Sequence, residues 1–158
     1  MQKCSLITVG KIKTAHWREA AENYRKKLRS SLRIEEIVLK DADSSLPAAE
    51  RNQQEGRRIL EAAAALPAAA LLICLDERGS ALSSKELAAL LEKCALESRH
   101  PCFIIGGAYG LSEEVQKAAH KKISLSALTF THELAQVILW EQLYRADSIL
   151  RGTGYHHD

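Results

Sequence analysis

The segment FIIGGAYGLSEEV, residues 103–115, indicates how this chain folds. An apolar run typical of a buried strand ends at Gly106 and Gly107, and Gly110 follows three residues later. Ser112 is placed to cap a helix, and the two glutamates after it suit the positive end of that helix. The spacing GGxxG differs from the GxGxxG of dinucleotide-binding turns, and no phosphate-loop GK[ST] follows. The turn is therefore either a tight connection or a wall of another kind of ligand site.

The same alternation of strand and helix extends over the whole chain. The pattern predicts strands at residues 3–9, 33–39, 69–75, 101–105 and 122–125, and helices at 14–28, 47–66, 83–97, 112–120 and 132–150. Gly56 lies inside the second helix, at a cost of about 1 kcal/mol relative to alanine. We expect a single α/β domain over residues 1–158, with a mainly parallel sheet flanked by helices.

Three predicted loops lie at the carboxyl ends of strands, where parallel sheets bind ligands. They are residues 75–80, 105–110 and 124–130, and each follows an apolar strand. The segment SLSALTF at 124–130 has no charged residue, so its backbone needs either burial or a ligand that offers hydrogen bonds. A purine ring would meet that need, and the alternative is a packed connection under the last helix.

Composition sets limits on the class of protein. With 158 residues, 46% hydrophobic and 27% charged, the chain is an ordinary globular domain able to bury a core. It has no apolar run of membrane-spanning length and no secretory cleavage site, which predicts a cytoplasmic protein without a membrane partner. The four cysteines lack the close spacing of metal sites and are expected to be buried thiols: Cys4, Cys74, Cys94 and Cys102.

The net charge of +2 does not by itself identify a nucleic-acid-binding protein. The basic residues nevertheless gather in two clusters, and each is either a solvated helix face or a set of phosphate contacts. The first cluster is Arg25, Lys26, Lys27, Arg29 and Arg33, and the second is Lys117, Lys121 and Lys122.

The last helix and the tail that follows carry further candidates. The helix is apolar over most of its circumference between Leu134 and Trp140, which predicts burial on a second side in a two-fold dimer. Glu141 lies one turn before Arg145, so this arginine is either an ion-pair partner or a cation for substrate. The tail contributes an aromatic ring and two imidazoles in the sequence YHH, which is too few ligands for a metal site.

Taken together, the motifs resemble those of the RlmH family of small bacterial SPOUT-class methyltransferases. The residues that carry the resemblance are IIGGAYGL, the segment SLSALTFTHELAQVILWEQLYRA and the terminal GYHHD, supported by VGK, EGRRIL and LDERGSALSSKE elsewhere. The resemblance implies a SPOUT fold with a C-terminal trefoil knot, a homodimer formed through the last helix, and S-adenosylmethionine as cofactor. It also implies a substrate, N3 of a pseudouridine in helix 69 of 23S ribosomal RNA, recognised on assembled ribosomes.

The resemblance assigns site residues by position. Cofactor-binding positions are Leu75, Gly106, Gly107, Leu125, Ser126, Ala127, Leu128, Thr129 and Phe130, with the glycines giving the backbone room to approach. In the catalytic set, His156 assists deprotonation or orients the base, Tyr155 stacks or hydrogen-bonds near it, and Arg145 steadies the developing anion or a phosphate. No metal site is expected.

Three positions depart from the family pattern: Thr131, Gln136 and Gly154 stand where a proline, an arginine and a proline are common. Thr131 still suits a helix cap, while the missing charge at Gln136 bears on RNA affinity. Two alternatives therefore stay open. One is a SPOUT methyltransferase with another RNA target, and the other is a ribosome-associated binding protein without catalytic activity.

Overall fold

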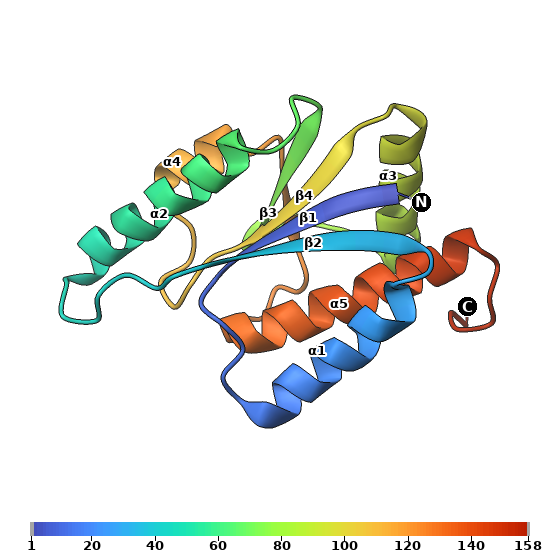
Figure 1. The fold of residues 1–158 in the computed structure, drawn as a ribbon, viewed down its shortest axis with the longest axis horizontal. Helices are drawn as coiled ribbons and strands as arrows, with labels where there is room; N and C mark the ends of the chain where they lie inside the picture. Colours follow the sequence, from blue (N-terminus) through green and yellow to red (C-terminus); the bar gives the residue numbers. More distant parts are fainter. Residues whose placement is uncertain (1, 158) are drawn as a thin grey trace.

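The computed structural model describes residues 2–157, and they form five parallel strands alternating with five helices (Figure 1). The sheet order is β2-β1-β4-β3-β5, so the predicted mainly parallel α/β architecture is confirmed. In chain order the elements are β1 Gln2–Val9, α1 Ala15–Leu28, β2 Leu32–Leu39, α2 Ala48–Ala64, β3 Ala70–Ala81, α3 Ser84–Leu96, β4 His100–Ile105, α4 Glu113–Ala118, β5 Lys121–Ser124 and α5 His132–Leu150.

The central strand β4 is buried on both faces and separates two hydrophobic clusters. Phe103 and Ile105 belong to the cluster under α1, α3 and α5, while Cys102 and Ile104 belong to the one under α2 and α4. Side chains alternate between the faces of a strand, and here both faces are covered by helices (Figure 1). This explains why residues 101–105 form an uninterrupted apolar run.

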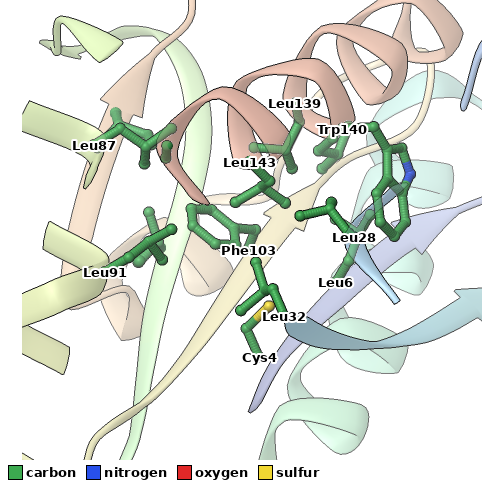
Figure 2. Packing of buried hydrophobic residues seen from close by; sticks show 14 of the residues in the cluster. Cys4, Leu6, Leu28, Leu32, Leu87, Leu91, Phe103, Leu139, Trp140 and Leu143 are labelled. Atoms are coloured by element: carbon green, nitrogen blue, oxygen red, sulfur yellow. The ribbon is translucent and has the colours of Figure 1, made fainter. Parts of the chain in front are cut away.

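Helix α5 is enclosed within its own chain more completely than the sequence indicates. Both α1 and α3 pack against it, and Figure 2 shows Leu143 of α5 lying over the ring of Phe103, with Leu87 and Leu91 of α3 beside that ring. Leu139, Trp140 and Leu143 are at most 1% exposed. Much of the apolar circumference of α5 is therefore covered without a second subunit.

The segment at 75–80 corrects the predicted loop. It belongs to β3, which runs on to Ala81 and pairs with β5 on both sides of an irregularity, so that Ile123 lies opposite both Leu75 and Ser80. A Cβ at Gly79 would lie 2.8 Å from the Ile123 nitrogen, so glycine allows this close pairing. Because the segment is polar, the sequence pattern did not predict a strand there. The strand is bulged in this part.

The helix caps agree with the sequence except at the first helix. Ser83 forms a capping box. The predicted caps are confirmed: the Ser112 hydroxyl accepts from the Val115 amide and the Thr131 hydroxyl from the Leu134 amide, both at 3.3 Å. At the first helix, Thr14 occupies the N-cap position but its side chain forms no cap hydrogen bond. Instead, the Lys13 amide, just before α1, donates to the Glu133 carboxylate at 2.6 Å.

Helix α2 is continuous through Gly56 because that residue meets α4. A Cβ at Gly56 would lie 2.2 Å from the Ser112 hydroxyl, so the glycine permits close helix packing that offsets its low helix propensity. All four cysteines are buried and unpaired, as expected. None of the helices within residues 2–157 is both long and apolar enough to cross a bilayer.

Leu143→Ala should lower the free energy of unfolding by about 2 to 5 kcal/mol, because truncation leaves a cavity between α5 and the sheet. Leu96→Ala is the matched control: this side chain is 81% exposed, and its loss should change stability by less than about 0.5 kcal/mol. Urea denaturation of both variants measures the difference. Equal effects would contradict the packing described for α5.

Candidate active site

A cavity of about 680 Å³ lies beside the middle of β3 and the carboxyl ends of β4 and β5, within the size range of small-ligand sites. The three segments expected to converge there all contribute to it. Its lining includes eight of the nine predicted cofactor-binding residues: Leu75, Gly106, Gly107, Leu125, Ser126, Leu128, Thr129 and Phe130. Ala127, the ninth, is exposed on the same loop and does not line the cavity.

The turn after β4 is held in a closed form by its own backbone. The Gly110 amide donates to the Gly107 carbonyl at 3.0 Å, and Gly110 has φ +73°, a conformation that favours glycine. A Cβ at Gly106 would lie 2.5 Å from the Gly110 carbonyl oxygen. The glycine at 106 is thus required by the turn itself, which adds a structural reason to the expected approach of a ligand.

Glu55 supports the same turn from behind, a role that sequence reasoning missed. Its carboxylate is 3% exposed, and one oxygen accepts a hydrogen bond from the Ala42 amide at 3.1 Å. The other oxygen, without a hydrogen-bond partner within residues 2–157, lies 2.8 Å from where a Cβ of Gly107 would be. Helical spacing relative to the buried Ile59 is the sequence signal that places Glu55 on the inner face of α2.

The uncharged loop after β5 meets part of its own hydrogen-bonding need. The Ser124 hydroxyl donates to the Ser126 carbonyl at 2.7 Å, and the Leu128 amide donates to the Ser126 hydroxyl at 3.0 Å. The Thr129 hydroxyl donates to the carboxylate of Glu77 on β3. Leu128 is nevertheless 72% exposed and lines the cavity, so the loop offers an apolar surface that is not packed under the last helix.

The three predicted catalytic residues gather at the far end of α5. The Arg145 guanidinium lies 4.8 Å from the centroid of the Tyr155 ring and 3.4 Å from Nδ1 of His156. Glu141 joins them: its Oε1 accepts from Nη2 of Arg145 at 2.5 Å and from the Tyr155 hydroxyl at 3.1 Å. The expected ion pair between Glu141 and Arg145 is therefore present.

This environment limits what each group of the tail does chemically. Burial, a hydrogen bond with Tyr24 and the charge of Glu141 raise the pKa of Tyr155 well above its usual range. Tyr155 consequently stays protonated near neutral pH and acts as a hydrogen-bond donor. Imidazole carries a ring nitrogen that can accept a proton, which makes His156 the candidate proton acceptor of this group.

The tail group and the cavity lie at opposite ends of α5. His132 and Ala135 line the cavity, whereas Arg145 comes ten residues later, about 15 Å further along the helix. In Figure 1 the C-terminal tail lies near the N-terminus, at the start of β1, and not at the carboxyl ends of the strands. One chain therefore does not bring Tyr155 and His156 to its own cavity.

The structure changes the interpretation of Gln136, which stands where an arginine is common in the family. Its side chain is 5% exposed, and Nε2 has no hydrogen-bond partner within residues 2–157. A charge at this position would be buried in the single chain, so its absence does not remove a solvent-facing contact to RNA. No group of three or more potential metal ligands occurs within the same residues.

The structure is that of a parallel α/β protein with a cavity of small-ligand size where parallel sheets commonly bind ligands. A probable methyltransferase from Bordetella pertussis has this fold, with TM-score 0.56, 13% identity, and 92% of this chain and 94% of that chain covered. A probable methylase family protein from Haemophilus influenzae gives TM-score 0.55 at 14% identity, covering 99% of this chain and 70% of that one.

The chain belongs to the SPOUT methyltransferase family, since the family model described as "Predicted SPOUT methyltransferase" matches residues 2–156. A relative from Oleidesulfovibrio alaskensis, named ribosomal RNA large subunit methyltransferase H, is 51% identical over 99% of this chain and 100% of its own length. One of the same name from Nitratidesulfovibrio vulgaris strain Miyazaki F is 48% identical with equal coverage. The resemblance inferred from the motifs is confirmed.

Gly106→Ala should destabilise the protein by about 1 to 3 kcal/mol, because the added Cβ meets the backbone carbonyl of Gly110, which cannot move aside as a flexible side chain does. Gly154→Ala is the control, because no atom lies within 4 Å of its added Cβ. Thermal unfolding of both variants measures the effect. A Gly106→Ala variant as stable as Gly154→Ala would refute the closed turn.

Proposed function

We propose that the protein is a cytoplasmic S-adenosylmethionine-dependent methyltransferase that methylates N3 of a pseudouridine in helix 69 of 23S ribosomal RNA, on assembled ribosomes. The observation that carries the proposal is the cavity at the strand ends, bounded by the motifs shared with the family. The large-subunit RNA named in the relatives supports the choice of substrate. The trefoil knot implied by the family stays a prediction.

The cavity fits an adenosyl cofactor in chemistry. Leu75, Ile105 and Leu125 give apolar walls for a flat ring, and the backbone of the glycine turn gives polar groups for its edge. Asp76 also lines the cavity, and its hydrogen bond with Arg78 lowers the pKa of the Asp76 carboxyl, so this side chain would offer a negative charge to a cationic cofactor. When bound, S-adenosylmethionine supplies an activated methyl group.

The tail residues supply the groups that the substrate nitrogen requires. N3 of a pseudouridine is an imide nitrogen that must lose its proton at or before attack. In the proposed mechanism His156 accepts that proton, the Tyr155 hydroxyl donates a hydrogen bond to the base, and Arg145 stabilises the developing anion. Glu141 holds Arg145 and Tyr155 in place through its Oε1.

The separation of tail and cavity supports a composite site in a homodimer. Since Arg145 lies about 15 Å beyond Ala135 on α5, the tail of one chain is too far from its own cavity. A two-fold dimer through α5 presents the tail of each protomer to the cavity of its partner. Each methyl transfer then uses the cofactor of one protomer and the tail of the other.

Calorimetry should show S-adenosylmethionine binding to the wild-type protein, and Leu125→Arg should abolish it, because a long cationic side chain fills the cavity and repels the sulfonium. Circular dichroism of Leu125→Arg controls for folding. A wild-type protein that binds no cofactor would refute the enzymatic proposal and favour a ribosome-binding role.

His156→Ala and Leu125→Arg should each be inactive alone, yet mixing them should restore activity if the site is composite. Random pairing in equal amounts makes half of the dimers mixed, and each mixed dimer has one intact site, so about a quarter of wild-type activity is expected. The measurement is tritium transfer to unmethylated ribosomes after co-refolding. A mixture as inactive as its components would exclude a site shared between protomers.

A further inference from the structure

A second hollow, of about 700 Å³, lies along the free edge of the sheet. Strand β5 is the last strand of the sheet and pairs only with β3, and the hollow lies between these strands and α3. We call it the edge groove. Its charged and titratable lining residues are Arg78, Glu86, Lys93, His120, Lys121 and Lys122.

The edge groove carries an excess of positive charge. Four cationic side chains line it against one carboxylate, that of Glu86. This carboxylate is engaged in the helix cap, where it accepts hydrogen bonds from the Ser83 amide at 2.7 Å and the Ser83 hydroxyl at 2.8 Å. The groove therefore presents cations to solvent, with its acid already occupied.

Most of the other clustered cations have partners on the chain. Arg25 binds Glu22 and Glu36, both at 2.6 Å, and Lys117 of the second cluster binds Glu113 at 2.8 Å. Lys121 and Lys122, in contrast, are exposed, and neither ammonium group forms an ion pair with a carboxylate of residues 2–157. Of the four cations that line the groove, Arg78 pairs with Asp76 and Lys93 pairs with Glu97 at 3.7 Å, which leaves Lys121 and Lys122 as its unpaired cations within residues 2–157.

The groove joins the active-site cavity through Arg78, which lines both. Its guanidinium is oriented by Asp76, with Nε and Nη2 each 3.2 Å from a carboxylate oxygen, and the side chain is 75% exposed. At the other side, Nδ1 of His120 accepts from the Leu72 amide at 2.9 Å, which leaves Nε2 as the donor of the neutral ring. Fixed donors therefore extend from the cavity along the edge groove.

We propose that the edge groove binds the sugar–phosphate backbone of the substrate RNA beside the target nucleotide, with Arg78 at the point where the base enters the cavity. The inference rests on the proposed function and adds to it a binding path. Phosphates are recognised by exposed lysine and arginine side chains of this kind, and sequence reading is not required of them. The alternative is a purely structural role, in which lysines on an edge strand prevent strand pairing between molecules.

The test is the double variant Lys121→Gln/Lys122→Gln in methyl transfer to unmethylated ribosomes. Loss of two phosphate contacts should raise KM for ribosomes about 10-fold at 100 mM KCl and reduce the slope of log KM against log KCl by roughly 1 to 2. The affinity for S-adenosylmethionine, measured by calorimetry, should stay at the wild-type value, because neither lysine lines the cofactor cavity.

Lys26→Gln/Lys40→Gln is the matched control, since it removes two exposed lysines that line neither hollow and form no ion pair with a carboxylate of residues 2–157. It should change KM less than about two-fold. A wild-type protein that transfers methyl groups while both double variants behave alike would overturn the edge groove and leave the proposed function intact. Failure of the wild-type protein to methylate ribosomes would instead refute the proposed function, and the groove with it.

Discussion

The burial of β4 on both faces is the constraint on which the rest of the structure depends. Because Phe103 and Ile104 point to opposite sides, each face of the sheet requires its own layer of helices. The strand must then leave the core at its carboxyl end within very little space. Gly106 allows this, since its backbone passes so close to the Gly110 carbonyl that a side chain does not fit. The cavity is formed where that turn leaves the sheet.

The direction of α5 follows from the same core and divides the chemistry of the protein. The helix returns across the sheet toward the strand starts, so its first turn borders the cavity while Arg145 and the tail lie at the other end. The chain thereby separates the proposed cofactor site from the proposed proton acceptor, His156. In the proposed dimer a two-fold partner would rejoin them, and this separation supports the proposal more directly than the apolar circumference of α5, much of which α1 and α3 already cover.

The cationic side chains differ in whether the chain provides a carboxylate partner for them. Glu22 and Glu36 neutralise Arg25 on α1, and Glu141 engages Arg145, so these cations are held by the chain. The lysines of β5 are left to solvent at a sheet edge that adjoins the cavity. The net charge of the chain is only +2, yet positive charge is in local excess beside the proposed active site.

The sequence by itself determined the alternation of strands and helices, the parallel sheet, two of the caps and the three segments around the cavity, because these depend on local periodicity and on the strand-end rule for parallel sheets. Only the tertiary structure decided that residues 75–80 continue β3, that Glu55 supports the Gly107 turn, and that His156 contacts Arg145 at the end of α5 away from the cavity. Each of these rests on contacts between segments distant in sequence, or on the direction of a helix across the sheet. A local sequence pattern contains no information on such contacts or on the direction of a helix.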